Sequence, residues 1–242
     1  MNEASAPIRR QGVVLTNRPE GRDARRLDIQ IDGVWTHRPG QVAELSVTRG
    51  DEGYFAIASP PHDGGRLTFL VRAGGSLSEP LMTLPVGAEV SVSGPWGRGY
   101  DLDAPGPVNR PLLLVGVGSA LGALRSPLLA TLSSRLHHPV VLVLGVRTLD
   151  DVGFADELDT WRAAGAEIHL VVSRSPDHLP LTSCFRGHVQ DHLVALASRL
   201  PGALVLLAGS ETFEDEVTEV LVGAGVATDR IQRNFRPDGR PG

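Results

Sequence analysis

The stretch LLLVGVGSALGALRSPL, residues 112–128, combines an apolar strand, a glycine-rich turn and the start of a helix. Gly116 and Gly118 lie where the strand passes into the helix. Glycine at such a turn lets the backbone approach a ligand, and the free N–H groups at a helix start attract phosphate. A Gly-x-Gly pair is equally typical of a tight turn that binds nothing. The stretch therefore predicts the first strand–helix unit of a parallel sheet, with nucleotide binding as one of two interpretations.

The same alternation of apolar strand and amphipathic helix continues along the second half of the chain. Further strands are predicted at VVLVLGV (140–146), EIHLVVS (167–173) and LVLLAGS (204–210), with a short last strand in DRIQRNF (229–235). Helices are predicted near residues 120–136, 151–164, 187–199 and 212–224. Because continuous apolar runs are typical of strands covered on both faces, we expect a doubly wound parallel-sheet domain at residues 108–242.

The first half carries shorter strands punctuated by Gly, Pro and Asp. Predicted strands are GVVLTN (12–17), RRLDIQIDG (25–33), QVAELSVTR (41–49), GYFAIAS (53–59), RLTFLVRA (66–73) and AEVSVSG (88–94). Apolar and polar residues alternate clearly in the second of these strands. Six strands at this spacing predict a small six-stranded antiparallel barrel at residues 1–107. The segment DLDAPGPVNRP (101–111) is the expected linker.

The composition excludes several classes of function. The chain has 242 residues, a hydrophobic content of 41% and a net charge of -5, which gives no general attraction to nucleic acid or anionic lipid. All 23 basic residues are arginine, so a lysine Schiff base is excluded. No apolar run approaches the roughly 18 residues of a membrane span, and the N-terminus lacks the apolar region of a signal peptide. We therefore expect no membrane insertion and a cytoplasmic location.

The cysteine and histidine residues predict no metal centre. Cys184 is the single cysteine, and one thiolate can neither form an internal disulfide nor hold an iron–sulfur cluster. His188 and His192 have the i, i+4 spacing of a helix face, but no third ligand accompanies them. We expect a solvated helix face at these histidines and no iron–sulfur cluster in this chain.

Taken together, the two halves resemble the ferredoxin–NADP reductase-like superfamily of flavin oxidoreductases. Six stretches carry the resemblance in order: PGQVAEL (39–45), GPWGRGY (94–100), GVGSALGALRS (116–126), LGVRTLDDVGFADEL (144–158), LLAGSETFEDEVTEVLVGAGV (206–226) and DRIQRNF (229–235). One branch, of plant and bacterial FAD/NAD(P)-binding oxidoreductase-like proteins, also keeps the Ala-Ile-Ala-Ser-Pro-Pro stretch of residues 56–61. The resemblance implies a FAD-binding-type barrel followed by an NAD(P)-binding-type domain.

The resemblance also implies which strand faces the flavin. The family's Arg-x-Tyr-Ser motif falls on Gly53, Phe55 and Ala56, so the polar contacts of arginine and serine are missing while Phe55 keeps an aromatic face for stacking. Arg72 or Arg98 is the expected replacement for the lost arginine, because a guanidinium pairs well with a phosphate. Tyr54 is not expected to replace Phe55, because neighbouring strand residues point to opposite faces.

A second flavin motif follows in LVRAGGSLSEPL (70–81), which resembles the family's Val-Lys/Arg-x-x-Gly-x-x-Ser. In the family this segment wraps the flavin phosphates with backbone N–H and hydroxyl donors, whereas a Gly/Ser hairpin that binds nothing is the alternative. An aromatic residue near the end of the chain, Phe235, falls where relatives shield the flavin. The expected FAD-binding residues are Phe55, Ala56, Ile57, Ala58, Ser59, Val71, Arg72, Gly75, Ser76, Leu77, Ser78 and Phe235.

The nicotinamide nucleotide motifs match in part. Ala120 replaces a glycine of the family's Gly-Thr-Gly-x-x-Pro, and we expect its Cβ to crowd a bound pyrophosphate. Ser173 and Arg174 stand where plant-type reductases bind the 2′-phosphate of NADP, which favours NADP(H) over NAD(H), although solvated arginines explain the same pattern nearly as well. The expected NADP-binding residues are Gly116, Gly118, Ser119, Arg147, Ser173, Arg174, Gly209 and Glu211.

Two functions follow from these observations. The first is a FAD-dependent oxidoreductase that passes electrons between NAD(P)H and an acceptor, with a protein electron-transfer partner or a larger complex beyond it. It needs no catalytic acid–base pair, because hydride transfer depends on positioning and exclusion of water. The second is a catalytically degenerate reductase-like subunit that serves as a binding or assembly module. Its support is that the family's ligand-facing positions carry substitutions, namely Gly53, Ala56, Ala120, Ala123 and Ala208.

Overall fold

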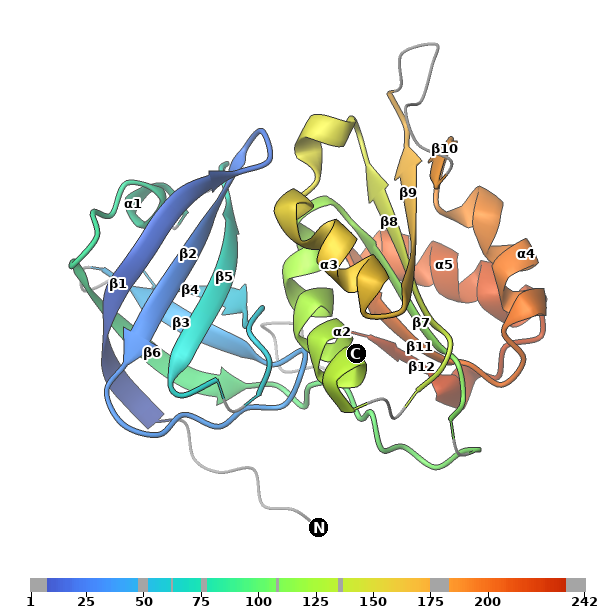
Figure 1. The fold of residues 1–242 in the computed structure, drawn as a ribbon, viewed down its shortest axis with the longest axis horizontal. Helices are drawn as coiled ribbons and strands as arrows, with labels where there is room; N and C mark the ends of the chain where they lie inside the picture. The colour runs from blue at the N-terminus through green and yellow to red at the C-terminus, as the bar shows by residue number, and fades with distance from the viewer. Residues whose placement is uncertain are drawn as a thin grey trace.

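Two sheets lie side by side in the computed structural model, which describes residues 8–47, 52–61, 63–74, 78–107, 109–134, 137–174 and 183–233. Figure 1 shows an antiparallel barrel formed by the N-terminal half and a helix-covered parallel sheet formed by the C-terminal half. Residues 97–111 connect the two sheets. We propose that the domain boundary lies in this connection, between residues 107 and 108.

The barrel sheet has the strand order β4-β3-β6-β1-β2-β5, and all of its pairings are antiparallel. Its strands are β1 (Ile8–Glu20), β2 (Ala24–Ile31), β3 (Val42–Ser46), β4 (Glu52–Ala56), β5 (Arg66–Arg72) and β6 (Glu89–Trp96). Leu27, Ile29 and Ile31 alternate along β2 and fill the barrel core, as their spacing predicts. The N–H of Ala58 donates to the carbonyl of Thr68 at 2.8 Å, which brings the chain after β4 against β5 and closes the sheet.

The parallel sheet has the strand order β10-β9-β8-β7-β11-β12. Its strands are β7 (Leu112–Val117), β8 (Val140–Val146), β9 (Ala166–Val172), β10 (Cys184–Arg186), β11 (Leu204–Ala208) and β12 (Ile231–Arg233). β7 pairs with β8 on one side and with β11 on the other, so the strand order reverses direction at β7. Ligands of such sheets bind at the carboxyl ends of the strands near the reversal point.

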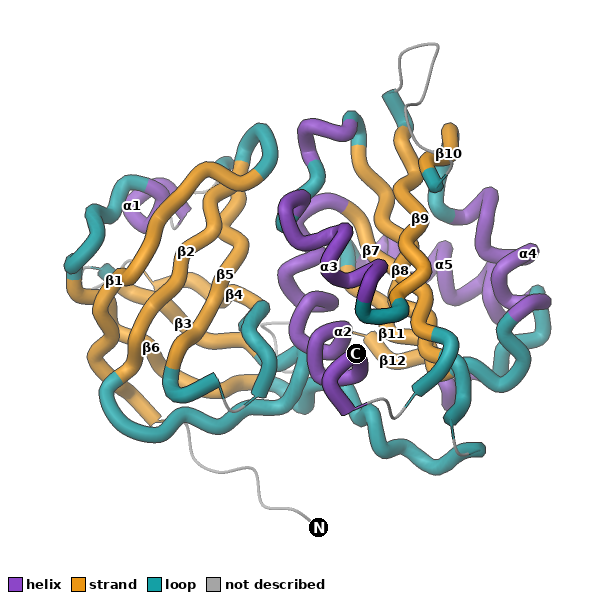
Figure 2. Tube along the Cα trace, viewed as in Figure 1, coloured by secondary structure: helices purple, strands orange, loops and turns teal. Residues whose placement is uncertain are grey.

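Helices cover both faces of the parallel sheet (Figure 2). The α-helices are α1 (Ser78–Met82), which belongs to the barrel half, and α2 (Leu121–Ser134), α3 (Leu158–Ala163), α4 (Gln190–Arg199) and α5 (Glu211–Gly223). Short 3₁₀ helices are η1 (Gly118–Ala120), η2 (Leu149–Asp151), η3 (Ala155–Glu157) and η4 (Thr228–Arg230). Leu112 and Leu114 of β7 pack under α2 and α3, whereas Leu113 and Val115 pack under α4 and α5. α2 and α3 therefore lie between the sheet and the barrel.

The fold class predicted from the sequence is confirmed, with differences in three elements. The three-residue strand β10 was not predicted, because a strand this short carries no alternation to detect. The helix predicted at 151–164 is reduced to α3, preceded by two 3₁₀ turns, and α1 was predicted only as a phosphate-binding loop. In the described part of the chain no helix is both long and apolar enough to cross a bilayer.

Apolar contacts join the two halves. Leu70 at the end of β5 lies so close to Gly153 that a Cβ built there would stand 2.8 Å from Leu70 Cδ2. The phenol of Tyr100, fully enclosed in the connection, donates to the carbonyl of Leu207 at 2.7 Å. Burial raises the pKa of this phenol well above its usual value, so it remains a donor at all physiological pH values.

Candidate nucleotide site between the two domains

A cleft of about 310 Å³ opens between the barrel and the carboxyl ends of the parallel strands. Its barrel wall is formed by the turn from β1 to β2 and the end of β5, and its opposite wall by the ends of β7, β8 and β9 with the segment before α4. Ligand pockets typically measure about 300–1,000 Å³, so the cleft has the size of a small binding site. It lies where a sheet of this topology binds ligands.

The turn after β7 forms the floor of the cleft. Gly118 has φ of 52°, a left-handed conformation that side chains rarely adopt, and a Cβ placed there would meet nothing within 4 Å. Its neighbour Ser119 also lines the cleft, at the start of η1 and α2. Gly116 lies deeper, since a Cβ would stand 2.7 Å from Leu124 Cδ1. Gly116 therefore permits close packing of strand and helix, and Gly118 leaves space beside the N–H groups.

Arginine side chains from both domains face the cleft. Arg72 ends β5 in the barrel, and Arg147 follows β8 in the parallel sheet; both side chains are exposed. The N–H of Arg174 donates to the carbonyl of Arg147 at 2.7 Å, which fixes the backbone at the ends of β8 and β9. Ser173 completes this wall, with its hydroxyl donating to the carbonyl of Val146 at 3.4 Å. Two guanidinium groups on opposite walls suit an anionic ligand.

Carboxylates at the rim pair with Arg22, a further arginine of the cleft lining. The side chain of Asp151 accepts the hydroxyl and the N–H of Thr148, each at 2.9 Å, and lies 3.6 Å from Arg22. Burial acts to raise the pKa of Asp151, but the hydrogen bonds from Thr148 and the charges of Arg22 and Arg147 lower it overall. Arg22 is thus neutralised by its own neighbours, whereas Arg72 and Arg147 have no ion pair with the described residues.

Four of the predicted NADP-binding residues line the cleft together: Gly118, Ser119, Arg147 and Ser173. Arg174, Gly209 and Glu211 are exposed and lie outside its lining, and Gly116 is buried beneath it. Ala120 is partly buried and packs against the core, and its predicted crowding of a pyrophosphate stays a prediction. The role of each residue in binding NADP stays a prediction.

The predicted flavin residues are less well placed. Ile57, Ala58, Ser59 and Val71 are buried, and the Ser59 hydroxyl accepts the N–H of Thr68 at 3.2 Å. Their contact with a cofactor stays a prediction. Ser78 is also buried, at 6% exposure, at the start of α1. Gly75, Ser76, Leu77 and Phe235 lie outside the described residues.

Phe55 and Ala56 are half-buried and do not line the cleft. Phe55 pairs with Ala43 across β3 and β4, so it shares the face of the sheet that packs on the barrel core. Tyr54 points to the other face, where its ring meets Trp96 edge-on at 6.3 Å. Of the described flavin residues, Arg72 lines the cleft, and its role in replacing an arginine contact to phosphate stays a prediction.

Sequence reasoning missed part of the lining. Glu20 ends β1, Asp23 and Gly153 come from turns between elements, and Phe213 comes from α5. His188 precedes α4 and was predicted to lie on a solvated helix face. No local pattern marks these residues, because the two walls of the cleft meet only when the barrel packs on the sheet domain. The capping box Thr148-x-x-Asp151 is a local signal for the turn after β8, whose Asp151 lines the cleft.

Curated relatives match most of the chain. Sulfhydrogenase 1 subunit gamma of Pyrococcus furiosus is 24% identical over 205 residues, covering 84% of this chain and 70% of that protein. The ferredoxin–NAD(P)(+) reductase component of the naphthalene 1,2-dioxygenase/salicylate 5-hydroxylase systems of Ralstonia sp is 28% identical over 227 residues, covering 90% and 66%. Ferredoxin–NADP reductase B of Sorangium cellulosum is 32% identical over 151 residues, covering 62% and 60%. No family model matches the chain.

Solved structures share the fold. The ferredoxin reductase in carbazole 1,9a-dioxygenase superposes with a TM-score of 0.82 at 22% identity, covering 94% of this chain and 69% of that one. A ferredoxin NADP+ reductase from Neisseria gonorrhoeae with bound FAD and NADP superposes with a TM-score of 0.78 at 14% identity, covering 94% and 99%. Both pair a barrel with a parallel sheet over nearly the whole length of this chain.

Proposed function

We propose that this chain, whose relatives and structural neighbours are ferredoxin reductase-like FAD/NAD(P)-binding oxidoreductases, is a flavin-dependent module that passes electrons between NAD(P)H and an acceptor. The observation that carries the proposal is the cleft between the two domains, where Gly118 and Ser119 line the same space as arginines from both walls. This arrangement supplies backbone N–H donors and two guanidinium groups to the phosphates of a dinucleotide.

The chain's own residues bind and orient in this proposal. Arg72 from the barrel and Arg147 from the sheet hold phosphate groups, while Val117, Val171 and Phe213 provide apolar surface for a ring. Arg147, Ser173 and the nearby Arg174 favour a 2′-phosphate, and hence NADP(H) over NAD(H). Catalysis by such a module depends on holding the two reacting rings in contact and keeping water out.

FAD, when bound, supplies the hydride chemistry. Among the described residues predicted for FAD, Phe55 and Ala56 keep partly exposed surface, whereas Arg72 is the arginine that this proposal gives to the nicotinamide nucleotide. The remaining predicted contacts are buried in the cores or lie outside the described residues. FAD binding is therefore supported by the fold and the relatives more than by a complete set of side chains.

The electron acceptor is a further part of the proposal. The chain spans 70%, 66% and 70% of the length of three relatives, two of which are reductase components of dioxygenase systems and one a sulfhydrogenase subunit. A module that shares this much of a reductase suits a protein partner that takes the electrons onward. We propose such a partner, in the same assembly or in a separate chain, as the acceptor.

Anaerobic reduction tests the proposed function. Purified protein loaded with FAD should lose its flavin absorbance when NADPH is added, and more slowly when NADH is added. A colourless protein that does not take up FAD would overturn the proposal.

Arg147→Gln tests the nucleotide site. Losing a charge-assisted contact to phosphate should weaken binding of 2′,5′-ADP by about tenfold, measured by calorimetry, because such hydrogen bonds contribute about 1.5–3 kcal/mol before exposure reduces them. Arg98→Gln is the matched control, since Arg98 is equally exposed and lies outside the lining of the cleft. Equal affinities in both variants would remove Arg147 from the site.

A binding module without redox activity is the second candidate. The burial of Ile57, Ala58 and Val71 favours it, because these positions present no exposed surface to a cofactor. The substitutions that first suggested it do not: Ala120, Ala123 and Ala208 pack into the core under α2, so alanine there follows from packing. A protein that binds 2′,5′-ADP but not FAD would identify this second function.

A further inference from the structure

Arginine–carboxylate pairs cross the interface beside the cleft. Arg18, Arg22 and Arg26 of the barrel pair with Asp156, Asp150 and Glu157 of the sheet domain, at 2.8, 3.4 and 2.5 Å respectively. The first two pairs are largely exposed and contribute little. The Arg26–Glu157 pair is the enclosed one, with side-chain exposures of 13% and 18%.

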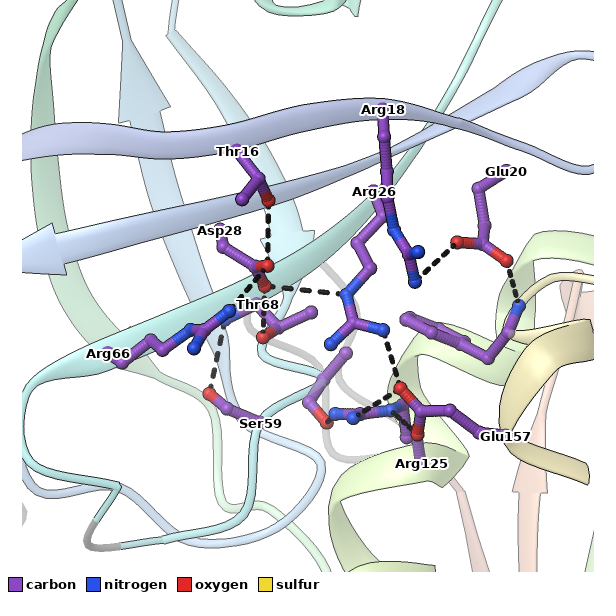
Figure 3. Close-up of polar contacts among 12 residues, drawn as sticks. Thr16, Arg18, Glu20, Arg26, Asp28, Ser59, Arg66, Thr68, Arg125 and Glu157 are labelled. Carbon is purple, nitrogen blue, oxygen red and sulfur yellow. Dashed lines mark hydrogen bonds and ion pairs between the residues drawn. The ribbon is translucent and has the colours of Figure 1, made fainter. Parts of the chain in front are cut away.

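Glu157 connects both domains through two arginines, as Figure 3 shows. Its Oε1 accepts from Arg26 and from Arg125 Nη2 at 2.8 Å, and its Oε2 accepts from Arg125 Nε at 2.9 Å. Arg125, on α2, extends further and donates through Nη1 to the carbonyl of Ala58 in the barrel at 2.8 Å. The Glu157 carboxylate thus holds one guanidinium from each domain. The guanidinium of Arg125 also donates to the backbone of the other domain.

Phe154 gives the cluster a rigid centre. Its ring lies 4.7 Å from the guanidinium carbon of Arg125 and 5.4 Å from that of Arg26, within the range of cation–π contacts. The residue is fully buried and left-handed, with φ of 52°, which a non-glycine residue adopts only under constraint. The carboxylate of Glu20 supplies that constraint by accepting the Phe154 N–H at 2.6 Å from across the interface.

Asp28 anchors the barrel end of the same cluster. Its carboxylate lies 3.5 Å from Arg26 Nε and accepts the hydroxyls of Thr16 at 2.8 Å and Thr68 at 2.6 Å (Figure 3). Arg26 is therefore held between a carboxylate of its own domain and Glu157 of the other. Charges alternate along the row Asp28, Arg26, Glu157 and Arg125, and the more exposed Arg66 adds a guanidinium 2.8 Å from Asp28.

A cluster of this kind fixes geometry more than it adds stability. The desolvation of enclosed charges offsets much of their attraction, whereas removal of one member leaves its partners unpaired. The bidentate contact of Arg125 with Glu157 also permits a narrow range of orientations. Two neighbours of Phe154 line the cleft itself: Glu20, which accepts its N–H, and Gly153, which precedes it in the sequence. A change in the cluster therefore changes the spacing of the two walls.

We infer that Glu157 is a positioning residue: by holding Arg26 and Arg125 together it sets the orientation of the barrel on the sheet domain and thereby the distance across the nucleotide cleft. The orientation itself does not depend on the proposed function, whereas its effect on hydride transfer rests on that function. The two effects are measured separately.

Spin labels report the orientation directly. Val34 in the barrel half and Val222 on α5 are exposed, at 79% and 43%, and suit paired cysteine labels in a Cys184→Ser background. Pulsed electron resonance should give one narrow distance distribution for the otherwise native protein. Glu157→Gln and Arg26→Gln should both broaden it. Arg26→Gln leaves the Arg125–Glu157 pair within the sheet domain intact, so it guards against a variant that fails to fold.

Asp159→Asn is the matched control, because Asp159 is 97% exposed and its ion pair among the described residues is with Arg162 of its own helix. It should keep the narrow distribution. Narrow distributions in folded Glu157→Gln and Arg26→Gln would overturn the inference. If the native protein itself gave a broad distribution, the inference would fail as well.

Kinetics separate positioning from a merely structural role. In Glu157→Gln, hydride transfer at saturating NADPH should fall roughly ten- to a hundredfold, since a displacement of about 1 Å costs that much. Binding of 2′,5′-ADP, which uses the sheet-domain wall, should stay within about twofold of the native value. Loss of both in equal measure would indicate damage to the fold and contradict the inference. If the native protein transfers no hydride, the proposed function fails while the distance measurement still decides the inference.

Discussion

Asp28 is a carboxylate with almost no exposed surface, 2%, in the middle of β2. Burial acts to raise its pKa, but hydrogen bonds from Thr68, Thr16 and Arg66 and the charge of Arg26 lower it to about 2. Because folding lowers the pKa of this group from 3.8, the ionised carboxylate stabilises the native state. This stabilisation is complete at pH values above the pKa of Asp28 in the unfolded state, and it is lost as the pH falls through the pKa of Asp28 in the folded state.

Asp28→Asn should lower the free energy of unfolding by about 2 kcal/mol at pH 7, measured by urea denaturation, since each pKa unit corresponds to about 1.4 kcal/mol. The difference from the native protein should narrow between about pH 4 and pH 2, where the native carboxylate takes up its proton. Asp32→Asn, at an exposed position directly after β2, should change the free energy of unfolding little. A difference that persists undiminished at pH 2 would contradict this view of Asp28.

In the turn between β7 and α2, a left-handed glycine, Gly118, lines the cleft. Gly118 is left-handed with open space around it, so substitution there strains the backbone without causing a clash. Gly223, at the end of α5, also has open space but lacks the left-handed conformation. The two glycines therefore separate the effect of backbone strain from that of added volume.

Gly118→Ala should lower the free energy of unfolding by about 1 kcal/mol, because a left-handed backbone conformation costs a non-glycine residue at least about that much. It should also weaken binding of 2′,5′-ADP, because relief of the strain moves the N–H groups of the turn. Gly223→Ala should have the opposite sign and stabilise the protein by up to about 1 kcal/mol, since alanine favours helix. Thermal unfolding and calorimetry measure both. Stabilisation by Gly118→Ala would show that the turn is not strained.

Elements with strong periodicity were predictable, and short ones were not. The buried runs of β7, β8, β9 and β11 and the alternation in β2 each carry many residues of one pattern. The three residues of β10 carry none, and pairing with β9 alone makes them a strand. The helix predicted at 151–164 is broken because Phe154 takes a left-handed conformation, which contacts from the barrel impose.

At the scale of the whole molecule, the candidate site was predictable mainly on one wall, with Arg72 the predicted residue of the other. Gly118, Ser119, Arg147 and Ser173 follow directly from strand ends, because parallel strands present their carboxyl ends at a common edge. The opposite wall, with Glu20 and the turn after it, depends on how the barrel docks. Motif alignment assigned Ile57 and its neighbours to the flavin, whereas in the structure Ile57 lies in the barrel core and the carbonyl of Ala58 accepts from Arg125 of α2.

A crystal structure of the protein with NADP+ tests the central claim most directly, namely that the interdomain cleft binds the dinucleotide. We predict electron density in the cleft, with phosphate groups between Arg72 and Arg147 and against the N–H groups of Gly118 and Ser119. Density for the nucleotide at another place on the protein, or an empty cleft in crystals grown at saturating NADP+, would contradict the account.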